Sequence, residues 1–330
     1  MRICIYGLGA VGGLMAARLA AAGQQVSAIA RGATLAAVTS GGLRLIETVD
    51  GKPVQSAHPV RVAADPAELG VQDLVVISVK TTGLREVARR IAPLIGPQTI
   101  VLSAMNGVPW WFFHGLDAGL AAREWPAIDE GGEVGRAIAA DRVLGCVVHL
   151  ACAMPEPGTV RHTQGQKLII GEPAGGDSER CARVAALLTG AGFEVEVSQR
   201  IQQAVWFKLW GNMTINPISA FTGATTDLIL DDPQVRDFVS AAMREASAIG
   251  AKMGLPIAIT PEERHVVTRK LGAFKSSMLQ DVEAGKPVEL DSLVTIVVEL
   301  GRALGVATPV IDSLLGLARL HARVHGLYPR

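Results

Sequence analysis

The sequence has only four cysteines, few aromatic residues and no excess of charge of either sign. A chain of 330 residues buries most of its surface without crosslinks, and its cysteines form no C-x-x-C pair, so neither a disulfide miniprotein nor a zinc site is expected. Lysine plus arginine equals aspartate plus glutamate at 31 each, so no net field attracts nucleic acid. We predict reduced thiols, no metal and no nucleic-acid partner.

Long uninterrupted apolar runs are also missing. Even the apolar segment 293–311 is broken by Glu299 and Arg302, whereas a bilayer-spanning helix needs about 18 apolar residues. The N-terminus enters a strand pattern at once, without the basic segment and apolar core of a signal peptide. These features predict a cytoplasmic protein with no membrane partner.

Apolar residues as a class are abundant. They make up 49% of the chain and charged residues only 19%, which excludes intrinsic disorder, and the length is typical of about two domains. This composition leaves more apolar surface than an ordinary monomer exposes. A homodimer interface is one way in which it would be covered.

Strand and helix patterns change partway along the chain. Short apolar runs alternate with helical patterns up to residue 198, which is typical of a parallel sheet with crossover helices. From residue 199 onward helical periodicity dominates. The segment 125–135 is expected to be a surface loop. The expected strands are 2–6, 25–30, 74–79, 100–104, 143–151, 167–171 and 194–197. The expected helices are 10–22, 180–191, 199–216, 233–254, 261–284, 290–305 and 309–324.

A glycine-rich motif follows the first expected strand. Gly7-Leu8-Gly9-Ala10-Val11-Gly12 has the form G-x-G-x-x-G and opens a helix. Gly7 permits a tight turn, Gly9 lets a pyrophosphate approach the backbone, and Gly12 lets the helix pack close to the strand. The N–H groups at the helix start would bind the phosphates. We predict an α/β protein with a Rossmann-type parallel-sheet domain at 1–198 that binds a dinucleotide, followed by an all-helical substrate domain at 199–330.

Polar residues follow three other expected strands. Arg31 occupies the place where an NAD-binding domain offers a carboxylate, and its guanidinium suits a 2′-phosphate, so the sequence favours NADP(H). The alternative is a solvated loop charge. Lys80 and Asn106 would emerge at the same sheet edge and reach the cofactor, although each one alone is typical of a cap or loop.

The helical half carries a polar stripe. Lys208, Asn212 and Asn216 recur every four residues, so successive members drift by only ~40° and climb ~6 Å. Apolar neighbours indicate that the stripe faces a substrate with carboxylate, keto and hydroxyl groups, and the alternatives are an internal hydrogen-bond network and a wet helix face. A partly desolvated Lys208 would have a lowered pKa and serve as a proton donor. Pro217 is expected to kink the helix.

The chain resembles the ketopantoate reductase family nearly end to end. The matching residues are GLGAVG at 7–12, Arg31, Lys80, Asn106-Gly107, the run 207–212, Asn216-Pro217, SSMLQD at 276–281 and ELD at 289–291. The resemblance implies an active site in a cleft between a Rossmann domain and a helical domain. It also implies reduction of 2-dehydropantoate by NADPH to (R)-pantoate, a step of pantothenate synthesis.

The same resemblance implies roles for individual residues. Lys208 would be the general acid that protonates the developing alkoxide, and Glu289 would complete the catalytic site. Substrate would be bound by Asn106, Asn212, Asn216 and Ser277. Cofactor would be bound by Gly7, Leu8, Gly9, Ala10, Val11, Gly12, Arg31, Lys80, Asn106 and Ala151.

One segment departs from the family pattern. Trp110-Trp111-Phe112-Phe113 follows the asparagine at 106, where compact members proceed directly to the next strand. These rings either reshape the pocket for another branched or aromatic 2-oxo acid, or form a hydrophobic plug or dimer contact. A further alternative is a protein that senses NADPH without turnover.

Overall fold

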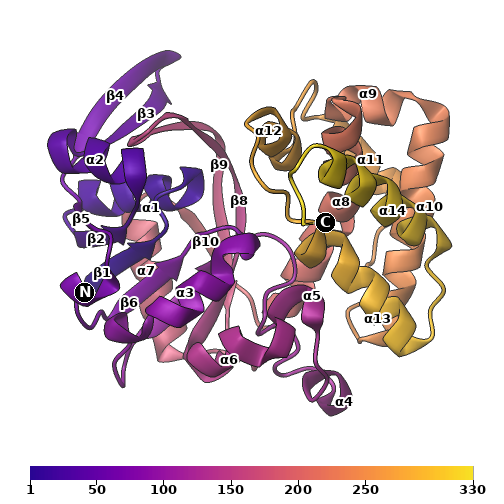
Figure 1. Ribbon diagram of the computed structural model, residues 1–330, viewed down its shortest axis with the longest axis horizontal. Coiled ribbons are helices and arrows are strands. Elements are labelled where there is room, and N and C mark those ends of the chain that lie inside the picture. Colours follow the sequence, from indigo (N-terminus) through magenta and orange to yellow (C-terminus); the bar gives the residue numbers. More distant parts are fainter. Residues whose placement is uncertain (330) are drawn as a thin grey trace. The chain divides into compact units, whose positions relative to one another are not determined.

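The computed structural model describes residues 1–329, which divide into two compact units (Figure 1). The first unit carries the sheet and the second is helical, so the predicted α/β class is confirmed. The second unit also takes two short segments from the N-terminal half of the chain, which no single boundary would assign to it. Unit 1 comprises Met1–Met105, Trp110–Gly115 and Gly132–Ile201, and unit 2 comprises Asn106–Pro109, Leu116–Gly131 and the residues from Gln202 onward.

Unit 1 is built on one ten-stranded sheet. The strand order is β4-β3-β9-β8-β7-β6-β1-β2-β5, and β10 pairs with β9. The pairs β3/β4 and β8/β9 are antiparallel, and the others are parallel. The strands are β1 (Arg2–Tyr6), β2 (Gln25–Ile29), β3 (Leu43–Val49), β4 (Lys52–His58), β5 (Arg61–Ala63), β6 (Leu74–Ile77), β7 (Ile100–Ala104), β8 (Val143–Glu156), β9 (Thr159–Gly171) and β10 (Glu194–Val197).

The chain reverses its direction of winding at β1. This strand pairs in parallel with β2 on one side and with β6 on the other. In open parallel sheets, ligands bind beyond the carboxyl ends of the strands at such a switch point. The topology therefore singles out the edge at which the glycine-rich turn follows β1.

Alternating residues of the strands supply two buried faces. Ile3 and Ile5 of β1 join one core with the helices α1 and α7. On the other face, Trp111 donates from Nε1 to Ser103 Oγ at 2.8 Å and Trp110 donates to the carbonyl of Ile138 at 2.9 Å. The helices of this unit are α1 (Ala10–Ala21), α2 (Gly32–Gly41), α3 (Leu84–Arg90), α6 (Glu133–Ala137) and α7 (Glu179–Gly190).

The aromatic run at 110–113 belongs to this second face. All four rings are buried, and Phe112 and Phe113 meet edge to face with centroids 5.2 Å apart. Both indole N–H groups are used inside the unit, as described above. The structure therefore favours the hydrophobic plug over a substrate-pocket lining.

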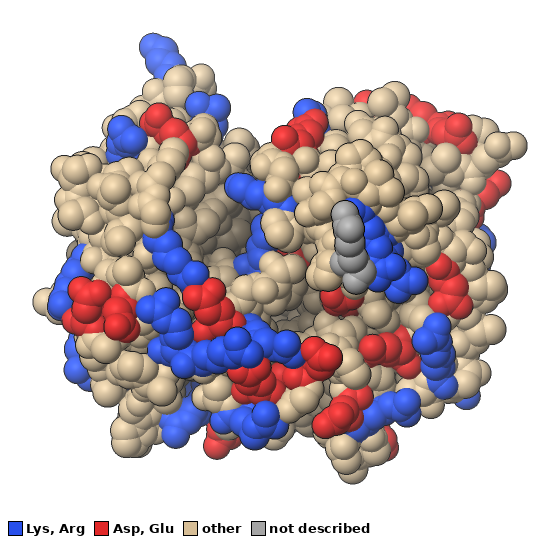
Figure 2. All heavy atoms as spheres, viewed as in Figure 1, with Lys and Arg blue, Asp and Glu red and all other residues tan. Residues whose placement is uncertain are grey.

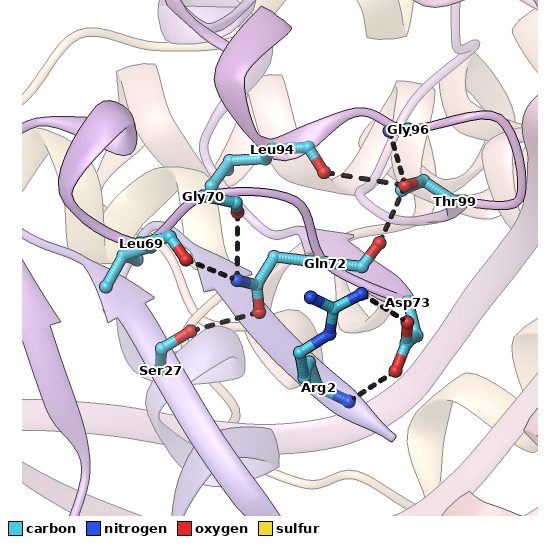
Figure 3. A network of polar contacts seen from close by, with 9 residues as sticks. All are labelled: Arg2, Ser27, Leu69, Gly70, Gln72, Asp73, Leu94, Gly96 and Thr99. Atoms are coloured by element: carbon cyan, nitrogen blue, oxygen red, sulfur yellow. Dashed lines mark hydrogen bonds and ion pairs between the residues drawn. The ribbon is translucent and has the colours of Figure 1, made fainter.

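A structural polar network lies at the amino ends of the parallel strands, opposite the end that carries the glycine-rich turn (Figure 3). Gln72 is buried and receives a bond from the hydroxyl of Ser27, while its amide nitrogen donates to two loop carbonyls at 3.0 Å. Thr99 donates to the backbone carbonyl of Gln72 at 2.6 Å, and Arg2 pairs with Asp73. Because these groups bond to one another, the polar residues at this edge serve the fold.

Unit 2 is organised around the long helix α8. Trp206 and Trp210 of α8 are almost completely buried, and Trp210 donates from Nε1 to the carbonyl of Met243 at 2.7 Å. A Cβ on Gly250 would lie 2.2 Å from Nε1 of Trp206, so glycine is required there. The helices are α4 (Ala118–Ala121), α5 (Pro126–Asp129), α8 (Ile201–Thr222), α9 (Thr226–Asp231), α10 (Pro233–Lys252), α11 (Pro261–Arg269), α12 (Ser277–Glu283), α13 (Ile296–Leu304) and α14 (Pro309–Val324), with a π-helical segment at Asp291–Thr295.

Several expected helix boundaries are wrong. The single helix at 261–284 is two helices, because Gly272 adopts a positive φ of 63° and Ser276 caps α12 by accepting from the N–H of Leu279. The helix expected to end at 216 continues past Pro217 to Thr222, since its last turns are buried. The expected loop at 125–135 contains α5 and the start of α6. Tertiary packing overrides the local signal of Pro217, whereas Gly272 and the Ser276 cap are local signals that divide the segment 261–284.

The expected strands 143–151 and 167–171 are also too short. They are parts of β8 and β9, which form a long antiparallel pair around a turn at Gly158 with φ 73°. The hairpin of β3 and β4 was missed, although Asp50-Gly51 is a two-residue turn signal with both φ values positive. Strand β4 has little burial, so it shows no apolar pattern.

The surface carries mixed rather than segregated charge. Figure 2 shows basic and acidic side chains interspersed over the viewed face. On α3 and α6, Arg85 and Arg89 both contact Glu133, at 3.2 Å and 2.6 Å. Such pairs neutralise charge locally.

Burial determines the chemical state of the cysteine thiols. All four cysteines are thiols that form no disulfide, and burial raises the pKa of Cys4 and Cys152 to about 12. Protonated thiols of this kind are poor nucleophiles, so these cysteines act as packing residues.

In the part of the chain from 1 to 329, no helix is both long and apolar enough to cross a membrane.

Candidate functional site

The glycine-rich turn after β1 is held by backbone contacts. Gly7 has φ 106°, and its N–H donates to the carbonyl of Ile29 at 3.1 Å. The hydroxyl of Ser78, which follows β6, donates to the carbonyl of Gly7 at 2.9 Å. Helix α1 then begins after Gly9, with no acidic residue in its first turn. Its first N–H groups and positive dipole end are therefore available to an anion.

The last two glycines of the motif have different surroundings. A Cβ on Gly12 would lie 2.2 Å from both the carbonyl oxygen of Gly7 and Oγ of Ser78. A Cβ on Gly9 would meet nothing within 4 Å. The space beside Gly9 is open at the helix start, which suits a pyrophosphate, whereas Gly12 serves close packing.

Alanine substitutions should separate these two roles. We predict that Gly12→Ala lowers the melting temperature, since a clash of this kind typically costs ~1–3 kcal/mol. Gly9→Ala should keep the melting temperature and weaken NADPH binding, because its methyl group occupies the open space. Calorimetric melting and titration of each variant with NADPH would measure both effects. A Gly9→Ala protein with normal affinity would contradict the assigned phosphate site.

A cavity of about 240 Å³ lies beside the turn in unit 1. Arg31 stands on its wall and pairs with Glu86 of α3, donating from Nη1 to Oε2 at 2.9 Å, while Nη2 lies 2.7 Å from Oε1. The hydrogen bond from Arg31 lowers the pKa of Glu86 from its usual range. The sequence analysis missed Glu86, because 55 residues separate it from Arg31. The cavity is lined by Tyr6, Gly7, Leu8, Ile29, Ala30, Arg31, Thr34 and Val79.

Two further predicted cofactor residues lie in unit 1. Lys80 is half-buried just after β6, on the strand end adjacent to the glycine turn. Ala151 lies inside β8 rather than at its end, and its carbonyl accepts a bond from the hydroxyl of Thr163 at 2.9 Å. The glycine motif, Arg31 and Lys80 therefore share one edge of the sheet.

The polar stripe of α8 lies in unit 2 together with Asn106. Lys208 donates from Nζ to Oδ1 of Asn106 at 2.7 Å, although 102 residues separate them. Asn106 follows β7, and the next residue, Gly107, packs against Ser292 so closely that a Cβ would lie 2.6 Å from its Oγ. The structure thus unites two residues that the sequence analysis selected separately.

Asn212 and Asn216 are the other members of the stripe. Asn212 is half-buried and Asn216 is 7% exposed, and neither side-chain amide has a hydrogen-bond partner among residues 1–329. An internal hydrogen-bond network was the alternative interpretation of this stripe, and these amides do not form one. They can bind a ligand or, on a wet helix face, water.

Ser277 and Glu289 lie in unit 2, the first at the start of α12 and the second just before the π-helical segment. Ser277 is the exposed first residue of α12, and the neighbouring buried Ser276 is the one that caps the helix. Glu289 is half-buried and precedes the π-helical segment by two residues. Asp291 accepts a bond from the Tyr328 hydroxyl at 2.5 Å, and so serves the fold.

These groups suit acid–base work on a small polar ligand. An ammonium held by an amide oxygen can donate a proton, and adjacent free amides can bind carboxylate or hydroxyl oxygens. Between residues 1 and 329, no three His, Cys, Asp or Glu side chains are grouped to hold a metal ion.

Comparison with known proteins places the chain in a family. Residues 3–175 match the family model "Ketopantoate reductase PanE/ApbA", and residues 200–322 match the model of its C-terminal part. The 2-dehydropantoate 2-reductase of Mesorhizobium japonicum is 44% identical over 329 residues, covering 99% of this chain and 100% of the relative.

Solved structures agree with this placement. A proposed ketopantoate reductase from Ralstonia solanacearum MolK2 has a TM-score of 0.93 and 55% identity, covering 99% of both chains. A D-mandelate dehydrogenase solved with NADH and anilino(oxo)acetate shares the fold at a TM-score of 0.82 and 19% identity, covering 99% of this chain and 100% of that one. The two model matches and the relative of 44% identity show that the chain belongs to the ketopantoate reductase family.

Proposed function

We propose that this protein reduces 2-dehydropantoate to (R)-pantoate with NADPH, as a step of pantothenate biosynthesis. The observation that carries the proposal is the 2.7 Å hydrogen bond from Lys208 Nζ to Asn106, beside the unpartnered amides of Asn212 and Asn216. The curated relative with 44% identity bears the name of this activity. The chemistry of these groups and the name of the relative therefore agree.

The residues of unit 1 fit a dinucleotide. The open space at Gly9 and the N–H groups at the start of α1 suit the pyrophosphate. Arg31, on the wall of the adjoining cavity, suits a 2′-phosphate. When bound, NADPH would supply a hydride to the ketone carbon of the substrate.

Lys208 would perform the acid step. Asn106 holds the ammonium through its amide oxygen, so the proton donor is fixed before the substrate arrives. The ammonium would stabilise the negative charge that develops on the ketone oxygen and then protonate that oxygen. Asn212, Asn216 and Ser277 would hold the other oxygen atoms of the substrate, and Glu289 would complete the site.

The decisive experiment is NADPH oxidation by the purified chain, with 2-dehydropantoate and a panel of branched and aromatic 2-oxo acids. We expect the highest kcat/KM for 2-dehydropantoate. A clearly higher value for another acid would overturn the substrate assignment and keep the reaction type. Binding of NADPH without turnover of any 2-oxo acid would favour the sensor alternative.

Other properties of the protein stay predictions. The pocket of another 2-oxo acid was suggested by the aromatic run at 110–113, which the structure buries in unit 1. We retain this alternative, and the panel of 2-oxo acids tests it. The homodimer, the cytoplasmic location and the absence of membrane and nucleic-acid partners are predictions from composition, from the lack of long apolar runs and from the pattern at the N-terminus.

A further inference from the structure

One arginine of unit 2 packs against the helix of Lys208. Arg264 lies on α11. Its guanidinium carbon is 5.1 Å from the ring centroid of Phe207. Its Nε and Nη2 are each 3.4 Å from the position that a Cβ on Gly211 would take. Glycine at 211 therefore lets the guanidinium approach the surface of α8.

Arg264 has no acidic partner in the part of the chain that the structure describes. The nearby carboxylates are engaged elsewhere: Glu262 binds Arg244, and Glu263 completes the cap of α11 at Thr260. Nε of Arg264 is buried without an acceptor among residues 1–329. Burial also lowers the pKa of this guanidinium. A desolvated cation without a counterion is unfavourable, so a ligand anion would stabilise this arrangement.

Arg264 lies close to the polar stripe of α8. Gly211 is three residues after Lys208, and residues with this spacing are neighbours on a helix surface. The half-buried side of α8 includes both of them. The same side comprises Ala204, Phe207, Lys208, Gly211, Asn212 and Ile215. Arg264 therefore borders the surface that carries the proton donor.

We propose that Arg264 binds the carboxylate of the 2-oxo acid, an inference that rests on the proposed function. The planar guanidinium offers two parallel N–H donors that match a carboxylate, which a lysine does not. Phe207 supports the guanidinium plane through a cation–π contact. Arg264 would thus select acids over uncharged ketones and orient the ketone toward Lys208.

The test compares 2-dehydropantoate with its uncharged methyl ester. R264M should raise KM for the acid by on the order of 10- to 100-fold, as expected for loss of a charged hydrogen-bond pair, and should leave KM for the ester nearly unchanged. The ratio of kcat/KM for acid to that for ester should therefore collapse. The matched control is R269M on the same helix, because Arg269 pairs with Asp231. This control should keep the wild-type ratio.

Further outcomes decide the assignment. R264K keeps a positive charge without the fork, so a partial fall in the ratio supports the proposal even if R264M fails to fold. An unchanged ratio in R264M or R264K, with or without a lower melting temperature, would show a packing role only and overturn it. If the wild-type protein reduces no 2-oxo acid, the proposed function itself fails. If the wild-type protein is active and the acid-to-ester ratio of kcat/KM is unchanged in the Arg264 variants, only the role of Arg264 is rejected.

Discussion

Lys208→Ala should lower kcat for 2-dehydropantoate by ~10²- to 10⁴-fold, the usual contribution of a general acid. The substitution removes both the proton donor and the positive charge beside the developing oxyanion. It leaves the glycine-rich turn untouched, since Gly7 to Gly12 belong to the other unit. Steady-state turnover and NADPH titration of the same preparation would measure both quantities.

The control for this substitution is Lys252→Ala. Lys252 is an exposed lysine in the last turn of α10, so its loss removes the same charge and side chain from a different surface. Turnover should stay at the wild-type level. If Lys208→Ala itself turned over nearly normally while binding NADPH, the proton would have to come from another group.

Arg31→Ala should reduce kcat/KM for NADPH by about 10- to 100-fold and change that for NADH much less. The guanidinium would contact only the 2′-phosphate, which NADH lacks. Measuring both cofactors with one substrate gives the ratio directly. Equal losses with NADPH and NADH would remove Arg31 from the 2′-phosphate site. Arg2→Ala is the matched control, because Arg2 pairs with Asp73 at the opposite edge of the sheet.

The contact between Arg31 and Glu86 sharpens this prediction. The carboxylate occupies two donors of the guanidinium, and it would repel a 2′-phosphate placed beside it. Glu86→Gln should therefore shift the ratio of kcat/KM toward NADPH, the direction opposite to Arg31→Ala. A shift toward NADH would contradict the competition between the carboxylate and the phosphate.

Local patterns predicted the bounds of several elements correctly. Strands β1, β7 and β10 and helix α14 begin and end at the expected residues. Each is an apolar, alternating or amphipathic run, and such signals are local. Strand β4 was missed because it is exposed and shows no apolar pattern. The segment 261–284 divides at Gly272 and at the Ser276 cap, two breaks that its periodicity does not show.

The amino-acid order alone determined that a glycine-rich turn follows the first strand and that Lys208, Asn212 and Asn216 share one side of a helix. Both facts depend on spacing within a few residues, which backbone geometry converts directly into position. Only the tertiary fold brought Asn106 to Lys208, Glu86 to Arg31 and Arg264 to Gly211. Those pairs lie 102, 55 and 53 residues apart, and contacts over such separations follow from how helices and strands pack, which no local pattern records.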